Sequence, residues 1–392
     1  MDNKKIKVAE IRGNGLSDRE TKTWEYFPKD IDISIFGAKK NIYNQSSSLL
    51  PIKTLHTSSD SFFVKNFYKY IFGQYQRMFG LEKLLVDFDI VHAGELFNYY
   101  TYQSVLAKNN NKKLKVVATV WENTFGRFEY NYWPGFKVPP RYWRDKLKKI
   151  MDANVQGVDM FLPVTTDSAE YLLDFGVPEE KIRVITPGVI KVEKKYKSEF
   201  PPELNEKEIY LMVNRLVREK GVYDVFYAWK IYLSKAQNSD KKVLVVVGGG
   251  PEYKNMKRLA GDLGLLGKSI LFFSQIPYND VLRLYEKAKC LLLGSMSTTT
   301  WQEQFGYVLA EAICADVPII STYSGAIPLV VGEAGILTSP AHPIEMSRAL
   351  LEIDKSDIYA RLKEGCRKEK KKFEVEEYVR QVADVYKKLA GI

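Results

Sequence analysis

Short apolar runs of strand length alternate with helix-like stretches along most of this 392-residue chain. In the first half the runs are residues 6–11, 31–35, 89–92, 116–120 and 159–164. They are rich in Ile and Val, and the stretches between them are long enough to form helices. This alternation predicts an α/β architecture, in which helices cover a parallel sheet.

The alternation stops at residues 191–206, which are rich in Lys, Glu and Pro and have no apolar period. Strand-like runs then resume at residues 209–213, 243–247, 270–273, 290–293 and 318–321. We therefore predict two doubly wound, Rossmann-like domains, 1–190 and 207–373, which are joined by a linker at 191–206 and face each other across a cleft. Apolar residues at helical spacing predict a closing amphipathic helix within residues 374–392.

The composition excludes several classes of protein. Hydrophobic residues make up 45% of the chain and charged residues 27%, which is typical of globular proteins and not of disordered or collagen-like ones. No apolar run approaches the roughly 18–20 residues of a membrane-spanning helix, and the N-terminus lacks the apolar core of a secretory signal. Three widely spaced cysteines favour neither a disulfide framework nor a zinc site. We therefore expect a cytoplasmic protein without a metal site.

The net charge of +10 is unevenly distributed along the chain. Residues 1–150 carry 25 Lys and Arg against 15 Asp and Glu, whereas residues 151–392 carry 33 of each. Two stretches of the first part, 62–72 and 141–150, interleave aromatic residues with Lys and Arg, a pattern found at membrane interfaces. We expect the first domain to face an anionic partner, such as an acidic membrane surface that the protein binds peripherally. The alternative is a solvated surface whose lysines only aid solubility.

Two glutamates, Glu303 and Glu311, are separated by seven residues. Glu311 falls in an apolar run that should be buried on nearly every side, where an ionised carboxylate needs hydroxyl or amide donors. The ribose diol of a nucleotide would supply such donors, and Glu303, in the loop before the helix, would be free to meet a sugar ring. The alternative is a helix-capping Glu and a Glu paired with a neighbouring Arg.

Two cations follow the first strand of the second domain. Arg215 and Lys220 lie between the run at 209–213 and the next helix, at the carboxyl edge where open α/β sheets bind ligands. Fixed cations beside a helix N-terminus suit a diphosphate and could stabilise it as a leaving group without a metal. The alternative is plain surface charge, and the chain has no Walker-type phosphate loop.

Two glycine turns follow strands, one at Gly13 and Gly15 and the other at Gly249 and Gly250. Each would let the backbone approach a ligand closely, although ordinary strand-to-helix turns explain them equally well. Neither matches the dinucleotide fingerprint, because its third glycine is missing. This spacing counts against a nicotinamide-dependent enzyme.

Together, these motifs resemble those of the family 4 retaining glycosyltransferases, which have the GT-B fold. The residues that carry the resemblance are Asn214-Arg215, Lys220-Gly221, the turn at 248–252, the pair Glu303 and Glu311, and Ile185-Thr186-Pro187-Gly188. The resemblance covers nearly the whole chain and is most specific in residues 208–340. It implies that the closing helix crosses back onto the first domain.

The resemblance also implies roles for individual residues. Arg215 and Lys220 would bind the donor diphosphate, Glu303 the transferred sugar and Glu311 the ribose. The first three of these would form the catalytic set. The other donor-binding residues would be Gly13, Gly15, Asn214, Gly249, Gly250, Phe305, Gly306 and Tyr307.

This chain departs from the family pattern at two places. Where many members have a His after the fourth strand of the first domain, it has Glu122, which we place on the acceptor side of the site. We place His92, at the end of a strand, on the same side; the alternative for His92 is a structural role. A Glu that the family commonly has is replaced by Leu329.

The implied reaction is transfer of a hexosyl group from a nucleoside-diphosphate sugar, UDP- or GDP-linked, to an acceptor hydroxyl with retention at the anomeric carbon. The acceptor would be a lipid-linked glycan, a glycolipid or a polysaccharide, and no cofactor or metal is expected. Two alternatives stay open: a GT-B protein that binds a sugar nucleotide without turnover, and a basic nucleic-acid-binding protein, given a pI of about 9.1. No nucleic-acid-binding motif supports the second, so we expect no nucleic-acid partner.

Overall fold

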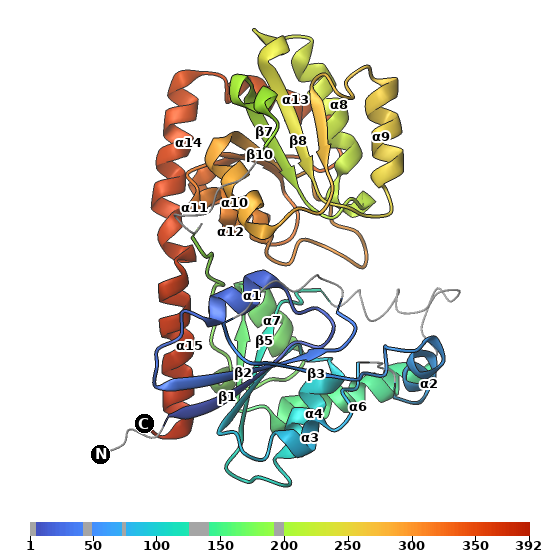
Figure 1. Ribbon diagram of the computed structural model, residues 1–392, viewed down its shortest axis with the longest axis vertical. Helices are drawn as coiled ribbons and strands as arrows, with labels where there is room; N and C mark the ends of the chain where they lie inside the picture. Colours follow the sequence, from blue (N-terminus) through green and yellow to red (C-terminus); the bar gives the residue numbers. More distant parts are fainter. Residues whose placement is uncertain (1–4, 42–48, 73–75, 125–140, 192–199) are drawn as a thin grey trace. The chain divides into compact units, whose positions relative to one another are not determined.

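The chain divides into two units, each built around a six-stranded parallel sheet (Figure 1). The computed structural model describes residues 5–41, 49–72, 76–124, 141–191 and 200–392. Unit 1 comprises Met1–Ile190 with Val375–Ile392, and unit 2 comprises Lys191–Glu374. The α/β class that the alternating pattern predicts is confirmed. Residues 192–199 of the predicted linker lie outside the described residues.

The sheet of unit 1 has the strand order β3-β2-β1-β4-β5-β6. Its strands are β1 (Ile6–Ile11), β2 (Ile31–Ala38), β3 (Ile52–Leu55), β4 (Ile90–Gly94), β5 (Lys115–Val120) and β6 (Met160–Pro163). All but β3 coincide with predicted runs, apart from shifts at their ends. Strand β3 is a short edge strand that pairs with β2 and buries none of its side chains fully, so its sequence lacks an apolar signal.

Helices cover both faces of this sheet. They are α1 (Asp18–Trp24), α2 (Phe62–Phe72), α3 (Leu81–Leu84), α4 (Tyr99–Ala107), α6 (Arg141–Gly157), α7 (Thr166–Asp174) and α15 (Val375–Ala390). Successive residues of β1 point to opposite faces, so Ile6 and Val8 pack with α15, whereas Ala9 and Ile11 pack with α3 and α4. The predicted amphipathic helix within 374–392 is thus α15, which lies along the β1 side of unit 1 (Figure 1).

The sheet of unit 2 has the order β12-β11-β10-β7-β8-β9. Its strands are β7 (Glu208–Val213), β8 (Lys242–Val247), β9 (Ile270–Phe273), β10 (Ala288–Leu292), β11 (Ile319–Thr322) and β12 (Gly335–Thr338). The first five coincide with predicted runs, with small shifts at their ends. Strand β12 is missing from the prediction because it is a short, partly exposed edge strand that begins with a glycine.

The helices of unit 2 pack on the two faces of its sheet, and loops lie at the carboxyl ends of the strands. The helices are α8 (Val222–Leu233), α9 (Tyr253–Asp262), α10 (Tyr278–Lys287), α11 (Tyr307–Cys314), α12 (Ile327–Val331), α13 (Pro343–Glu352) and α14 (Ser356–Glu369). Helices α8, α9 and α13 share a core with one face of the sheet, and Figure 1 shows α10, α11 and α12 on the other. Because the strands are parallel, the loops that follow β7, β8, β10 and β11 meet at a single carboxyl edge.

Candidate functional site

Lys220 and Glu303 form an ion pair at the carboxyl edge of the unit 2 sheet. Lys220 Nζ donates to Glu303 Oε2 at 2.6 Å, and Ser295 Oγ donates to the same oxygen at 2.8 Å. Glu303 is 5% exposed, and Lys220 Nζ lies 4.9 Å from the centre of the Trp301 ring. Two donors on one oxygen fix the direction of this carboxylate. Two residues that the sequence places in the catalytic set are therefore in direct contact.

Close backbone packing brings Lys220 to this position. The short 3₁₀ helix η3 (Arg218–Lys220) ends at Gly221, whose φ is +60°. A Cβ at Gly221 would lie 1.8 Å from the Gly294 carbonyl oxygen, so only glycine fits. The Met296 amide donates to the Glu219 carbonyl at 2.9 Å. The segment after β7 is thereby pressed against the loop after β10, which carries Glu303.

Two other residues after β7 that are predicted to bind the donor, Arg215 and Asn214, differ in their environments. The Arg215 side chain is 71% exposed and lies 3.5 Å from the Glu219 carboxylate. The Oδ1 and Nδ2 atoms of Asn214 are buried and have no hydrogen-bond partner within the described part of the chain. Arg215 is thus an exposed cation at the same edge, and Asn214 has unused hydrogen-bonding capacity within the described residues.

The glycine turn after β8 packs against the turn after β7. The Leu216 amide donates to the Gly249 carbonyl at 2.8 Å, and a Cβ at Gly250 would lie 2.5 Å from the Leu216 carbonyl oxygen. A Cβ at Gly249 would meet no atom within 4 Å, so that position is open. Contact between the two turns accounts for Gly250 without a ligand, while Gly249 leaves room for one.

Glu311 is buried in α11 with hydroxyl partners, as the apolar surroundings of this residue predict. It is 4% exposed; Tyr278 donates to Oε1 at 2.8 Å and Tyr285 to Oε2 at 3.2 Å. Both tyrosines come from α10: Tyr278 is its first residue, and Tyr285 lies two residues before its last. Sequence reasoning does not identify these partners, although their spacing of seven residues places them on one helix face.

The segment before α11 divides between core and surface. The Phe305 ring is buried and contacts the rings of Tyr307 and Phe373 with centroid distances of 5.3 and 6.0 Å. Gly306 has a φ of +77° and forms the N-cap of α11. Phe305 is therefore a packing residue in this structure, whereas Tyr307 remains partly exposed.

In unit 1 the predicted glycine turn follows β1 and leads into α1. Gly13 packs against Tyr100, whereas a Cβ at Gly15 would meet no atom within 4 Å. Arg12 Nε donates to Glu20 Oε1 at 3.1 Å, and the other Glu20 oxygen accepts from the Ser17 amide in a capping box. The turn is therefore held at both ends, and Gly15 is its open position.

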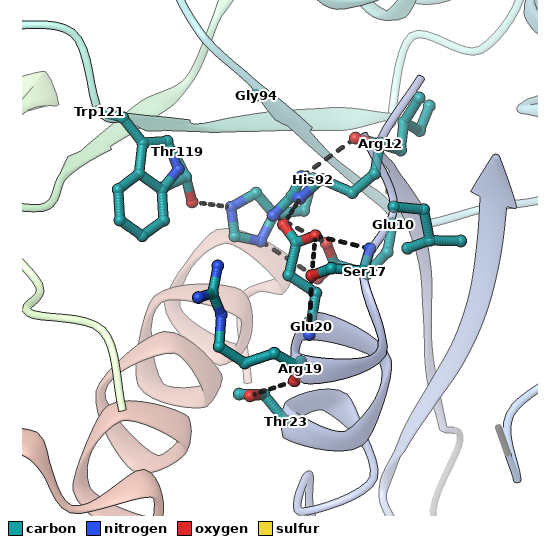
Figure 2. A network of polar contacts seen from close by, with 12 residues as sticks. Glu10, Arg12, Ser17, Arg19, Glu20, Thr23, His92, Gly94, Thr119 and Trp121 are labelled. Atoms are coloured by element: carbon teal, nitrogen blue, oxygen red, sulfur yellow. Dashed lines mark hydrogen bonds and ion pairs between the residues drawn. The ribbon is translucent and has the colours of Figure 1, made fainter. Parts of the chain in front are cut away.

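Three neighbouring strands place polar residues in a row beneath α15 (Figure 2). Glu10 pairs in register with His92, and Thr119 lies one strand further. His92 Nε2 is 2.7 Å from Thr119 Oγ1, and His92 Nδ1 is 3.2 Å from Glu10 Oε1 and 2.5 Å from the Tyr386 hydroxyl. Both ring nitrogens of His92 therefore have partners inside unit 1, and the residue is fully buried. This arrangement favours the structural role for His92 over the acceptor-side one.

The charge of Glu10 is compensated inside this network. Burial alone would raise the pKa of its carboxyl group, but the charges of His92 and Arg12 and the hydrogen bonds from His92 and Tyr386 leave it below the ordinary value. Burial alone would lower the pKa of the Arg12 guanidinium group, but the charges of Glu10 and Glu20 raise it above the ordinary value. The network is thus a set of mutually stabilised charges in an apolar interior.

Glu122 follows β5 and is fully buried. Its Oε1 accepts from the Asn123 amide at 3.3 Å, and its own amide lies 3.5 Å from Glu95 Oε2. The other Glu95 oxygen accepts from the Trp121 amide at 3.1 Å, and Glu95 has a φ of +66°. Glu95 therefore holds the loop that carries Glu122. Sequence reasoning did not single it out, because nothing in the residues around it marks the unusual backbone conformation.

Two features are missing from the residues that the structure describes, a metal-binding cluster and a membrane-spanning helix. Among them, no group of three or more His, Cys, Asp or Glu side chains is placed to hold a metal ion. None of the helices in the same part of the chain has the length and apolar character that a membrane crossing requires. That the reaction needs no metal stays a prediction.

Comparison with protein families identifies the chain. A model described as glycosyl transferases group 1 matches residues 193–373, and a model described as glycosyltransferase family 4 matches residues 51–190. The chain belongs to the family 4 glycosyltransferases. The family resemblance carried by the motifs of unit 2 is thereby confirmed.

Curated relatives are similar over part of their length. An uncharacterized glycosyltransferase of Methanocaldococcus jannaschii is 25% identical over 68% of this chain and 66% of its own. A D-inositol 3-phosphate glycosyltransferase of Corynebacterium kroppenstedtii is 24% identical over 55% of this chain and 48% of its own. The chain thus matches between about half and two thirds of the length of these relatives.

Solved structures with the same fold cover nearly the whole of this family 4 glycosyltransferase. A glycosyltransferase from Rickettsia africae has a TM-score of 0.68 at 18% identity and is matched over 98% of both chains. Anabaena HepE, crystallised in complex with UDP and glucose, has a TM-score of 0.71 at 14% identity over 98% of this chain and 100% of its own. The predicted GT-B fold class is confirmed by these matches.

Proposed function

We propose that this glycosyltransferase moves a hexosyl group from a nucleoside-diphosphate sugar to an acceptor hydroxyl and retains the configuration at the anomeric carbon. The observation that carries the proposal is the Lys220–Glu303 pair, which sets a cation beside a carboxylate at the ligand-binding edge of the unit 2 sheet. The presence of UDP and glucose in the HepE complex supports a sugar nucleotide as the donor.

In the proposed reaction, the bond between the anomeric carbon and a diphosphate oxygen breaks while a bond to the acceptor oxygen forms. The proton of the acceptor hydroxyl passes to an oxygen of the leaving diphosphate. Negative charge develops on the diphosphate, and a cation held in place before the reaction stabilises it most effectively. Lys220 has three N–H donors, so it can bind a phosphate oxygen while one donor remains with Glu303.

Arg215 and Glu303 complete the proposed catalytic set. Arg215 is exposed at the same edge, and its planar guanidinium can bind a phosphate in two places. Glu303 Oε2 accepts from Lys220 and Ser295, and a carboxylate has about four lone-pair sites, so Glu303 can also accept from hydroxyl groups of the transferred sugar. The proposal assigns stabilisation of the leaving group to these side chains and includes no metal or cofactor.

Glu311 is the proposed contact for the nucleoside. Each of its oxygens accepts one tyrosine hydroxyl, from Tyr278 or Tyr285, and each has a second lone-pair site. Ribose hydroxyls can donate to those sites or replace the tyrosines. A UDP- or GDP-sugar is the donor we favour, and the open position at Gly249 leaves room for its approach.

The acceptor is proposed to bind unit 1 in the cytoplasm. The excess of positive charge in residues 1–150 suits a phosphorylated, lipid-linked glycan or another glycolipid. A polysaccharide is the other acceptor class, since the capsular polysaccharide biosynthesis glycosyltransferase CapM of Staphylococcus aureus is 32% identical over 38% of this chain. Glu122 and the loop held by Glu95 are the acceptor-side residues in this proposal.

Saturation-transfer NMR with a panel of UDP-, GDP-, ADP- and dTDP-sugars tests the donor site. We expect one donor to show contacts at its ribose and sugar, and we expect Glu311→Gln to remove them. Glu364→Gln, at an exposed glutamate of α14, is the matched control and should leave them unchanged. Failure of every donor at about millimolar concentration, where ligands of roughly −4 kcal/mol are detected, would contradict the proposal. Binding without consumption in the presence of glycan and glycolipid acceptors would favour the non-catalytic alternative.

A further inference from the structure

Helix α2 of unit 1 exposes three phenylalanine rings. Phe62 is 74% exposed, Phe63 is 83% exposed and Phe67 is 59% exposed. Burying such a ring removes a large apolar area from water, and monomeric proteins seldom leave several neighbouring aromatic rings uncovered. This patch therefore indicates a surface that is covered when the protein works.

The packing of α2 explains why these rings face outward. Tyr68 contacts the Phe79 ring with a centroid distance of 5.9 Å, and the Arg77 guanidinium lies 5.8 Å from the centre of the Tyr68 ring. At 100° per residue, Phe63 and Phe67 lie about 40° apart around the helix and at least about 100° from Tyr68. Phe62 lies about 120° from Tyr68, and its ring contacts that of Phe63 with a centroid distance of 5.9 Å. Tyr68 thus anchors the helix to unit 1 while the phenylalanines are held away from it.

One cation lies beside the start of α2, and two more are exposed at the strands that precede it. Lys39 and Lys40 directly follow β2, and Lys53 is the second residue of β3, which pairs with β2. Lys40 Nζ donates to the Asp60 carbonyl at 2.7 Å, which places this cation beside the first turn of the helix. Exposed aromatic rings flanked by cations are the features of a surface that lies in the headgroup region of an acidic bilayer.

We infer that α2 docks this protein on an anionic lipid surface, with Phe62, Phe63 and Phe67 inserted among the lipids and the neighbouring lysines on the headgroups. Charge complementarity selects an acidic lipid surface as the occupant, because the exposed rings lie beside the Lys40 side chain and the excess charge of residues 1–150 is positive. The inference goes beyond the proposed function, and it would bring a lipid-linked acceptor to unit 1.

Vesicle flotation tests this inference directly. Full-length protein is mixed with vesicles of phosphatidylcholine alone or with about 30% phosphatidylglycerol, at physiological salt. We expect recovery on the anionic vesicles only, reduced about tenfold or more when Phe62, Phe63 and Phe67 are all replaced by Ser. Replacing Lys39, Lys40 and Lys53 by Ala should lower recovery and weaken its dependence on salt.

The matched control replaces three other exposed apolar residues, Leu173, Val184 and Ile344, by Ser. This variant should bind vesicles like the wild type, and all variants should keep the thermal unfolding midpoint and the donor binding of the wild type. Three outcomes would overturn the inference: equal recovery on neutral and anionic vesicles, no recovery on either, or full recovery of the phenylalanine variant. No recovery on either kind of vesicle, or full recovery of the phenylalanine variant, would point to a protein partner for the exposed rings. Donor binding in solution is measured separately, so failure here leaves the proposed function unaffected.

Discussion

The Tyr386 hydroxyl donates a 2.7 Å hydrogen bond to Glu10 Oε1 in the interior of unit 1, although the two residues are 376 positions apart. The bond joins the last helix of the chain to its first strand. Two residues after Glu10, Arg12 begins the glycine turn for which the family resemblance implies a role in donor binding. Docking of α15 and the geometry of that turn therefore depend on the same buried group.

Tyr386→Phe should destabilise unit 1 by about 1–3 kcal/mol, because it leaves the buried Glu10 carboxylate and His92 Nδ1 with one partner fewer. Urea unfolding followed by circular dichroism measures the change. Tyr323→Phe removes an exposed hydroxyl and serves as the control, with little expected effect. Equal stability of the two variants would show that the buried hydrogen bond contributes nothing.

The lowered pKa of Glu10 predicts a dependence of stability on pH. A carboxyl group whose pKa is lower in the folded state stabilises the fold above its ordinary pKa of 4.5. That contribution is lost as the pH falls below this value, because the unfolded state takes up the proton first. Urea midpoints measured between neutral and acidic pH should fall less steeply for Glu10→Gln than for the wild type. A steeper fall for the variant would contradict the direction of the shift.

Gly221→Ala should destabilise unit 2 by about 1–3 kcal/mol through its positive φ alone, with a further cost from overlap with the Gly294 carbonyl. It should also weaken donor binding, because Lys220 precedes it. Gly261→Ala, in α9 where an added Cβ meets no atom within 4 Å, is the control and should be neutral or stabilising by up to about 1 kcal/mol. Thermal unfolding of the two variants compares them directly.

Lys220→Met should reduce donor consumption by about 10²–10³-fold, because the leaving diphosphate loses a fixed cation. The Lys268→Met variant, at an exposed lysine of the same unit, is the control. Release of nucleoside diphosphate is measured by coupled assay, and unfolding midpoints are compared to exclude a loss of fold. Unchanged turnover in a folded Lys220→Met variant would remove Lys220 from the catalytic set.

The sequence predicts the sheets well where strands are buried on both faces. Central strands such as β8 are apolar runs rich in β-branched valine, a pattern that favours a strand buried on both faces. The edge strands β3 and β12 do not have this signal, since most of their side chains contact solvent and polar residues are tolerated there. Their positions depend on pairing with β2 and β11, which a single sequence does not reveal.

The site was only partly predictable for a similar reason. The burial of Glu311 and its need for hydroxyl donors follow from the apolar residues around it, but the identity of Tyr278 and Tyr285 depends on how α10 packs against α11. The contact of Lys220 with Glu303 likewise depends on the close approach of two loops. The burial of His92 beneath α15 depends on a helix far away in the sequence, so its partners could not be inferred from its strand.

The stereochemistry of sugar transfer tests the central claim most directly. The enzyme is incubated with the α-linked sugar nucleotide that it binds, and the anomeric protons of the earliest product are observed by proton NMR before mutarotation. The account predicts an α-configured product, formed by the wild type and not by Lys220→Met. A β-configured product would show inversion and contradict the proposed reaction, and absence of any donor consumption with every acceptor would show that the protein is not a glycosyl transferring enzyme.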